Sequence, residues 1–190
     1  MSTHTLRNII SLFIIVSAAS YNAYSQEYKL KSSYIGILPS VLFEPYDTIE
    51  AIEVNIVPFV YEYKFNRETG IQFRSIVNYR FYKLRNGISQ IGGTLLINKY
   101  LTSLFKEDFF IIPVISGFCT YTFNQIDKIN TSTVGIEPGV MFKVSNSFTI
   151  NLNLQPGINY YHGSFSRKFI GTKSGFKPHF GVIFHMGYHF

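Results

Sequence analysis

Charged side chains are scarce in this chain of 190 residues. Asp, Glu, Lys and Arg together make up 15% of it, whereas a soluble globular domain averages about 25%. Aromatic residues take their place at 17%, chiefly 19 Phe and 14 Tyr. Intrinsic disorder is excluded, because disordered chains combine low hydrophobicity with high charge. The composition therefore predicts a folded protein with few groups that need water.

Cysteine and clustered charge are also lacking. Cys119 is the single cysteine, so no internal disulfide forms, and one thiol says little about the redox compartment. Basic residues exceed acidic ones, but they are spread along the chain. Nucleic-acid-binding proteins instead gather basic residues into a patch or stripe, so we expect no nucleic-acid partner.

Long apolar runs are confined to the N-terminus. The polar start "MSTHTLRN" precedes the apolar run "IISLFIIVSAAS", and the small residues Ala23 and Ser25 stand just before Gln26. This three-part pattern predicts that residues 1–25 are a cleaved export signal. The alternatives are a buried N-terminal helix or a lone anchor. Cleavage leaves 16 basic and 11 acidic residues, and the longest later run, "FFIIPVISGF", is broken by Pro113, Ser116 and Gly117.

No helical period is found in residues 26–190, which alternate instead with the period of two that is typical of strands. Turn signals separate eight such stretches, at 34–44, 51–60, 71–82, 90–98, 109–123, 133–143, 148–161 and 176–190. Tight connections at 66–70 and 145–147 alternate with mostly longer polar ones. Short turns at one end and long loops at the other are typical of outer-membrane barrels. We therefore predict one domain, residues 26–190, folded as an all-β, eight-stranded antiparallel up-and-down transmembrane β-barrel.

The two faces of these strands favour a membrane barrel over a soluble one. The apolar face carries almost no charge, and aromatic residues collect near both strand ends, as at the two interfaces of a membrane barrel. Small residues lie on the polar face, where a narrow lumen has room for little more than side chains. These small residues are Gly36, Gly92, Gly135, Gly139, Gly157, Gly181 and Gly187. A soluble barrel with an apolar interior is the alternative.

Register can be tested at one hairpin. When the hairpin is centred on Asn146, Glu137 stands opposite Gln155 and Gly139 opposite Asn153, so that polar residues share a face. One stretch breaks the alternation, because after Pro58 it turns Glu62 and Lys64 outward. Either these two side chains reach water at the membrane interface, or Pro58 marks a bulge.

The signal peptide, the alternating strands and the terminal "FHMGYHF" resemble those of small outer-membrane β-barrel proteins of Gram-negative bacteria. In that family an aromatic terminal strand looks like the signal read by the barrel-assembly machinery, which implies this role for Phe184, Met186, Tyr188 and Phe190. The aromatic and Asn content is similar to that of Bacteroidota barrels, including OmpA-like barrels and the PorT-like group linked to secretion. The resemblance implies an outer-membrane location. It also implies partners among membrane lipid, lipopolysaccharide, the assembly machinery, and envelope or secretion-complex proteins.

Charged residues on the polar face are candidates for a network inside the lumen. They are Glu53, Arg74, Arg80, Glu137 and Lys143. Buried charges need partners, so we expect them to plug the lumen; a narrow selective pore is the alternative. His179, His185 and His189 also face inward, but at a rise of about 3.3 Å per residue neighbours in this series lie about 13–20 Å apart. We therefore expect no metal site, and no cofactor.

One stretch contains residue types that are found in catalytic sites. In "YYHGSFSRK", His162 and Ser164 are two residues apart, similar to the His-x-Ser of outer-membrane lipid A deacylases. Those enzymes have Asn after the Ser and a Glu that orients the His, whereas here Phe165 follows and no carboxylate is near. A Ser nucleophile needs an oriented base, so we expect no enzyme. The remaining classes are a structural or partner-binding barrel, a secretion accessory, and a lipid-modifying hydrolase or small channel.

We expect the mature protein to begin at Gln26, and to stay in the outer-membrane fraction after carbonate washing. A small barrel should also migrate differently in gels before and after boiling. N-terminal sequencing and fractionation measure this, and recovery in the soluble periplasm would favour a lipocalin-like barrel instead.

Overall fold

The computed structural model describes residues 33–39, 41–46, 49–81, 86–102, 110–126, 128–145, 147–163 and 174–190. Side chains at 41–51, 163 and 174 are not described. The predicted signal peptide, 1–25, lies outside the described residues, as does Ser164. None of the described residues forms a helix that is long and apolar enough to cross a membrane.

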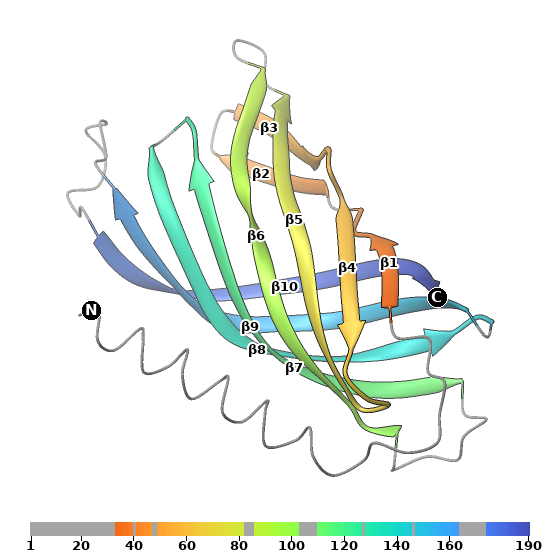
Figure 1. The fold of residues 1–190 in the computed structure, drawn as a ribbon. Helices are drawn as coiled ribbons and strands as arrows, with labels where there is room; N and C mark the ends of the chain where they lie inside the picture. The colour runs from red at the N-terminus through yellow and green to blue at the C-terminus, as the bar shows by residue number, and fades with distance from the viewer. Residues whose placement is uncertain are drawn as a thin grey trace. The chain divides into compact units, whose positions relative to one another are not determined.

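The described chain folds into ten antiparallel strands (Figure 1). Their bounds are β1 (Ser33–Ile37), β2 (Val41–Tyr46), β3 (Ile49–Asn55), β4 (Phe59–Lys64), β5 (Thr69–Phe81), β6 (Gly87–Tyr100), β7 (Ile111–Asn124), β8 (Ile129–Lys143), β9 (Phe148–Gly163) and β10 (Ser174–His189). Eight of them close a ring in the order β1–β4–β5–β6–β7–β8–β9–β10, and β10 pairs with β1. We call the end with the β4–β5, β6–β7 and β8–β9 connections the turn end, and the opposite end the loop end.

The prediction of an eight-stranded up-and-down barrel is confirmed, because the ten strands fill eight positions in the wall. The first predicted strand is interrupted into β1 and β2, and the second into β3 and β4. β3 and β4 both pair with the same edge of β5, β3 near the loop end and β4 near the turn end. β2 in turn pairs with β3, and β1 with β4.

A bulge separates β3 from β4, so the second of the two readings of Pro58 is the right one. Ile56 and Val57 are both exposed, and after them Val60 and Glu62 are buried while Phe59 is exposed. One extra residue has therefore shifted the alternation. The expectation that strict alternation turns Glu62 outward fails for this reason, because Glu62 lies inside at 1% exposure.

Two polar side chains satisfy the backbone of the bulge. The Asn55 Oδ1 atom accepts hydrogen bonds from the N–H groups of Val57 and Val77 at 3.2 and 3.1 Å, and its Nδ2 donates to the Ser75 carbonyl at 3.1 Å. The Ser75 hydroxyl accepts from the Phe59 N–H at 3.0 Å and also bonds the Val57 carbonyl. Side chains thus replace the ladder bonds that the extra residue interrupts.

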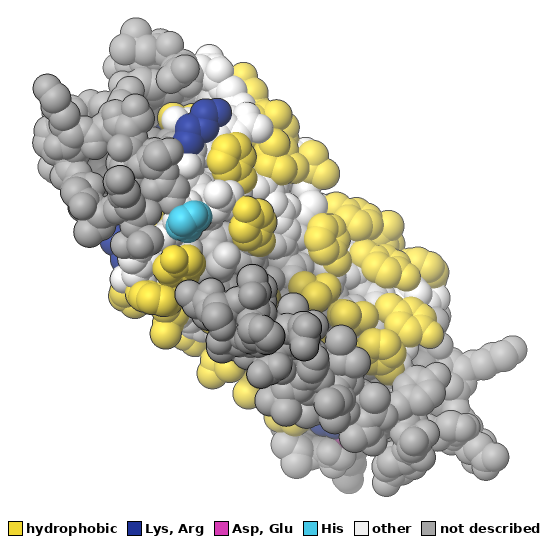
Figure 2. Space-filling model, turned by 60° about the vertical axis from the view of Figure 1, so that its left-hand side comes forward, with side chains coloured by type: hydrophobic (Ala, Val, Ile, Leu, Met, Phe, Trp, Pro, Cys, Tyr) yellow, Lys and Arg dark blue, Asp and Glu magenta, His cyan; other side chains and the backbone are white. Residues whose placement is uncertain are grey.

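The wall is apolar outside and largely polar inside. Among the described side chains, more polar and charged ones than hydrophobic ones are buried, while large hydrophobic side chains of every ring strand are exposed. Figure 2 shows such hydrophobic side chains spread along one face, with few charged ones between them. The predicted β8–β9 register is found as well, with Gly139 opposite Asn153.

Replacing Asn55 by Ala should destabilise the barrel by about 1–3 kcal/mol, because it leaves two backbone donors of the bulge without their acceptor. Asn159→Ala is the matched control, since the Asn159 side chain bonds only other side chains, those of Thr133 and Tyr161. Urea unfolding in lipid vesicles measures both. Equal losses for the two variants would contradict this role for Asn55.

Candidate functional site in the barrel lumen

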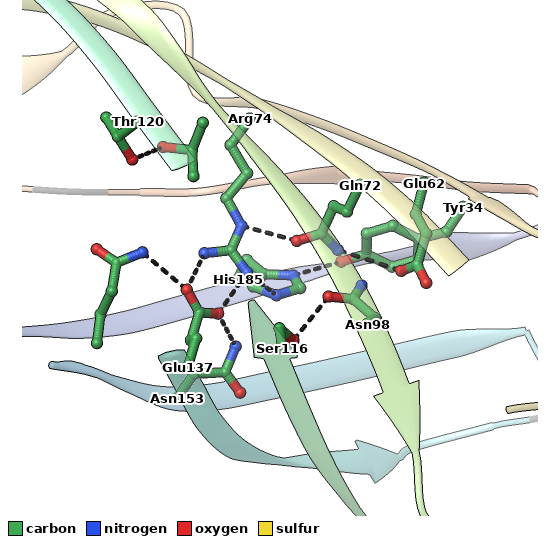
Figure 3. Close-up of polar contacts among 12 residues, drawn as sticks. Tyr34, Glu62, Gln72, Arg74, Asn98, Ser116, Thr120, Glu137, Asn153 and His185 are labelled. Carbon is green, nitrogen blue, oxygen red and sulfur yellow. Dashed lines mark hydrogen bonds and ion pairs between the residues drawn. The ribbon is translucent and has the colours of Figure 1, made fainter. Parts of the chain in front are cut away.

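In the described part of the lumen, side chains from all eight wall positions are buried. Near its middle an ion pair joins opposite walls, and hydrogen bonds connect it to neighbouring polar side chains (Figure 3). The described lumen also contains apolar clusters, which the pattern of polar inward residues did not predict. These layers together form the candidate site.

Arg74 on β5 and Glu137 on β8 form the central pair. The guanidinium donates from Nη1 to Oε2 at 2.8 Å and from Nη2 to Oε1 at 2.6 Å, and both side chains are at most 3% exposed. Asn153 and Gln155 on β9 each donate a further bond to the same carboxylate, at 2.7 and 2.8 Å. Two parallel bonds of this kind fix both distance and orientation, so the pair ties β5 to β8 across the lumen.

A second buried carboxylate continues the network toward the turn end. Arg74 Nε donates to Gln72 Oε1 at 2.7 Å, and Gln72 Nε2 donates to Glu62 Oε2 at 3.1 Å. The Tyr100 hydroxyl lies 2.7 Å from both oxygens of Glu62, and the Lys64 ammonium lies 4.4 Å from the centroid of the Tyr100 ring. The sequence pattern missed Glu62, because its inward position depends on the bulge at Pro58.

Tyr34 and His185 complete the centre of the network. The Tyr34 hydroxyl and His185 Nδ1 are 3.0 Å apart, and Arg74 Nη2 lies 3.4 Å from His185 Nε2. The Tyr34 ring needs the absent side chains of Gly36 and Gly187, because a Cβ at either glycine would lie 2.5–2.7 Å from the ring or its hydroxyl. The inward glycines therefore make room for large neighbours in a lumen of this width.

Apolar side chains pack together inside the lumen at two further places. Near the turn end, Tyr100, Ile112, Val114 and Met141 pack together as buried residues, and we call them the basal cluster. Beside β1 and β10, Tyr34, Leu38 and Val60 pack with the partly buried Ile183, and we call them the seam cluster. Leu96 and Phe118 are also buried. The sequence does contain an indication of these residues. Apolar residues such as Ile112, Val114 and Leu96 occupy positions that the alternation turns inward.

The other predicted lumen residues lie apart from the central pair. Arg80 and Glu53 form their own ion pair near the loop end, with Nε 2.5 Å from Oε1. The expectation for Lys143 is wrong as to burial: it is the last residue of β8, and its side chain is exposed at the turn end. A residue at the very end of a strand has the inward phase but lies beyond the enclosed part of the lumen.

The catalytic candidates are not brought into a site by the described residues. His162 is exposed near the end of β9, where its ring stacks at 6.5 Å from that of Tyr160. Its hypothesised partner, Ser164, lies outside the described residues. Within the part of the chain that the structure describes, no group of three or more His, Cys, Asp or Glu side chains could hold a metal ion.

The terminal residues proposed as an assembly signal alternate along β10. Phe184, Tyr188 and Phe190 are exposed, and His185 and His189 between them are buried. Phe190 and Ser33 also exchange two backbone hydrogen bonds, at 2.9 and 3.1 Å. The last residue therefore takes part in closing the ring at the turn end.

Comparison with known proteins adds a structural likeness. No protein-family model matches the sequence, and a comparison with curated proteins finds no match either. Among solved structures, this chain is similar to the crystal structure of the outer membrane protein OprG from Pseudomonas aeruginosa. The TM-score is 0.48 at 13% identity, over 85% of this chain and 97% of that one. At that level of similarity, the fold assignment rests on the strand pairing itself.

Replacing Arg74 by Met should cost about 3–5 kcal/mol, because the Glu137 charge is then left buried without its partner. The double variant Arg74→Met/Glu137→Leu should recover most of that loss, because neither member of the pair is then left as a buried charge without its partner. Unfolding free energies in vesicles measure both.

The exposed pair Lys99–Glu68, with Nζ 2.6 Å from Oε2, is the matched control. Lys99→Met should cost less than about 1 kcal/mol, as is usual for a surface ion pair. A loss for Arg74→Met no larger than that for Lys99→Met would mean that the central pair does not hold the lumen together.

Proposed function

We propose that this protein is an integral outer-membrane β-barrel that conducts no ions, and that it serves the envelope as a structural or partner-binding barrel or as an accessory of a secretion complex. The observation that carries this proposal is that an ion pair and an apolar cluster lie one after the other inside the lumen. An ion moving along the axis would meet the Arg74–Glu137 pair and then the basal cluster. Eight strands leave room for side chains and little else.

The outward faces support the membrane part of this proposal. Residues such as Ile136, Leu154 and Ile158 lie near the middle of their strands and are 47–54% exposed. Burial of one such side chain away from water is worth about 1.5–3 kcal/mol. A wall that exposes them all round is stable in lipid and prone to aggregate in water.

The predicted terminal signal fits the same proposal. Phe184 and Tyr188 on β10, and Phe190 directly after it, are exposed aromatic side chains at alternate positions, where the resemblance stated above expects the assembly machinery to bind. The hydrolase alternative lacks support, because His162 has no carboxylate beside it in the sequence. Copurification from native membranes separates the remaining roles, since a partner in fixed stoichiometry favours the secretion or partner-binding role.

Reconstituted wild-type protein should give no steady single-channel steps in planar bilayers. The variant Arg74→Ala/Glu137→Ala removes only the central pair. It should also show no conductance, because the basal cluster still blocks the axis. Adding Tyr100→Ala and Met141→Ala to that variant should open a small conductance. Steady steps from the wild type would refute the proposal, and the exposed variant Lys99→Met serves as a control for leakage.

A further inference from the structure

The ring of strands is closed over only part of its height. β1 pairs with β10 at four positions, from Tyr34 opposite His189 to Ile37 opposite Met186. Beyond them, within the described residues, β2 pairs with β3 and the loop-end half of β10 pairs with β9, but β2 and β10 do not pair with each other. Figure 1 shows their ribbons well apart. We call this gap the seam.

Exposure along β10 agrees with a free edge at the seam. Phe176, Phe180 and Val182 are 72%, 69% and 63% exposed, the three highest values among the large hydrophobic residues described. All three lie on the outward face of the part of β10 that has β9 on one side only. No described strand pairs with this part of β10 on the side of the seam.

Hydrogen bonds show which residues turn their backbone toward the seam. Ser33 and Phe190 exchange two bonds, so odd-numbered residues of β1 and even-numbered residues of β10 face each other. The Leu38 N–H donates to the Pro58 carbonyl on the opposite side, so the next residue, Pro39, faces β10. Pro178 is even-numbered and faces the seam as well.

A third proline has the same orientation. Tyr46 pairs with Ile49 around the two-residue connection 47–48, and the pair that flanks such a tight hairpin exchanges backbone bonds. Pro45, one residue earlier, therefore turns away from β3 and toward the seam. Proline has no N–H, and within sheets it is confined largely to such unpaired edges. Three prolines on one seam thus encode a poorly bonded edge.

The sequence nevertheless retains one register in which the seam could close. If the β1–β10 pairing continued, Val41 would stand opposite Val182 and Phe43 opposite Phe180. On the other face Glu44 would stand opposite His179. Apolar residues would meet apolar ones, and an acid would meet a histidine, which is how paired strands are normally matched.

Bonding in that closed register would be incomplete. Each bonded pair of an antiparallel ladder exchanges two hydrogen bonds. The pairs Val41–Val182 and Phe43–Phe180 keep both, but the pair at Pro39 keeps one, and Pro45 opposite Pro178 keeps none. We propose that the seam has two states. It is open in this structure, and it closes when β2 pairs with β10 in the register that places Val41 opposite Val182. When the seam opens, a lateral gap forms beside Leu38 and Ile183 of the seam cluster.

Cysteine cross-linking in native membranes tests this inference, with Cys119→Ser as background. Under copper-phenanthroline oxidation, Ile37→Cys/Met186→Cys should link fast, because that pair is permanently formed. Val41→Cys/Val182→Cys should link within one chain but several-fold more slowly. The off-register pairs of position 41 with Cys at 180 or 184 should link far less. No link between 41 and 182, a preference for an off-register pair, or a link as fast as that of 37 and 186 would overturn the proposal.

Restoring the missing donors tests the cause. Pro45→Thr/Pro178→Thr should raise the rate of the 41–182 link several-fold toward that of the 37–186 link, whereas Pro113→Thr on β7 should leave it unchanged. An unchanged rate after both seam replacements would refute the role of the prolines. Links formed mainly between two chains would show that the edge receives a second copy, which would also overturn the proposal. None of these outcomes depends on whether the lumen conducts ions.

Discussion

Backbone pairing is the constraint on which this barrel depends. A strand in the wall exposes a polar group at every residue, and a group left unpaired away from water costs several kcal/mol. The bulge between β3 and β4 interrupts the ladder with β5, and there Asn55 and Ser75 supply the missing partners. At the seam the chain uses another solution, because proline removes the donor itself. The same constraint thus explains why polar side chains bond the backbone at the bulge and why two strands stay unpaired at the seam.

The width of the lumen is the second constraint, and it follows from the number of strands. Eight strands enclose a space that side chains fill, so each large inward residue needs small neighbours. Tyr34 lies over Gly36 and Gly187, and the Phe118 ring lies 2.7–3.0 Å from where a Cβ of Gly135 or Gly157 would stand. The interior therefore packs as a core does, although many of its members are amides, hydroxyls and ions.

Buried charge determines how that core holds together. The Arg74 guanidinium and the Glu137 carboxylate bond each other and the amides of Gln72, Asn153 and Gln155. A charge so enclosed is costly to separate from its partner. The charged part of the lumen thus ties opposite walls together, whereas at the seam, beside the apolar seam cluster, the described strands β2 and β10 do not pair.

The sequence by itself determined the strand positions, the inward and outward faces and the β8–β9 register, because a period of two and a tight turn are local properties of the chain. It did not determine that Glu62 lies inside, because the bulge that places it depends on Asn55 and Ser75 meeting across strands. Only the tertiary structure paired Arg74 with Glu137, 63 residues apart. In a closed barrel each strand is shifted along its neighbours, and this stagger decides which residues lie at the same height in the lumen. No local pattern in the sequence encodes it. That same stagger leaves Lys143 exposed at the turn end.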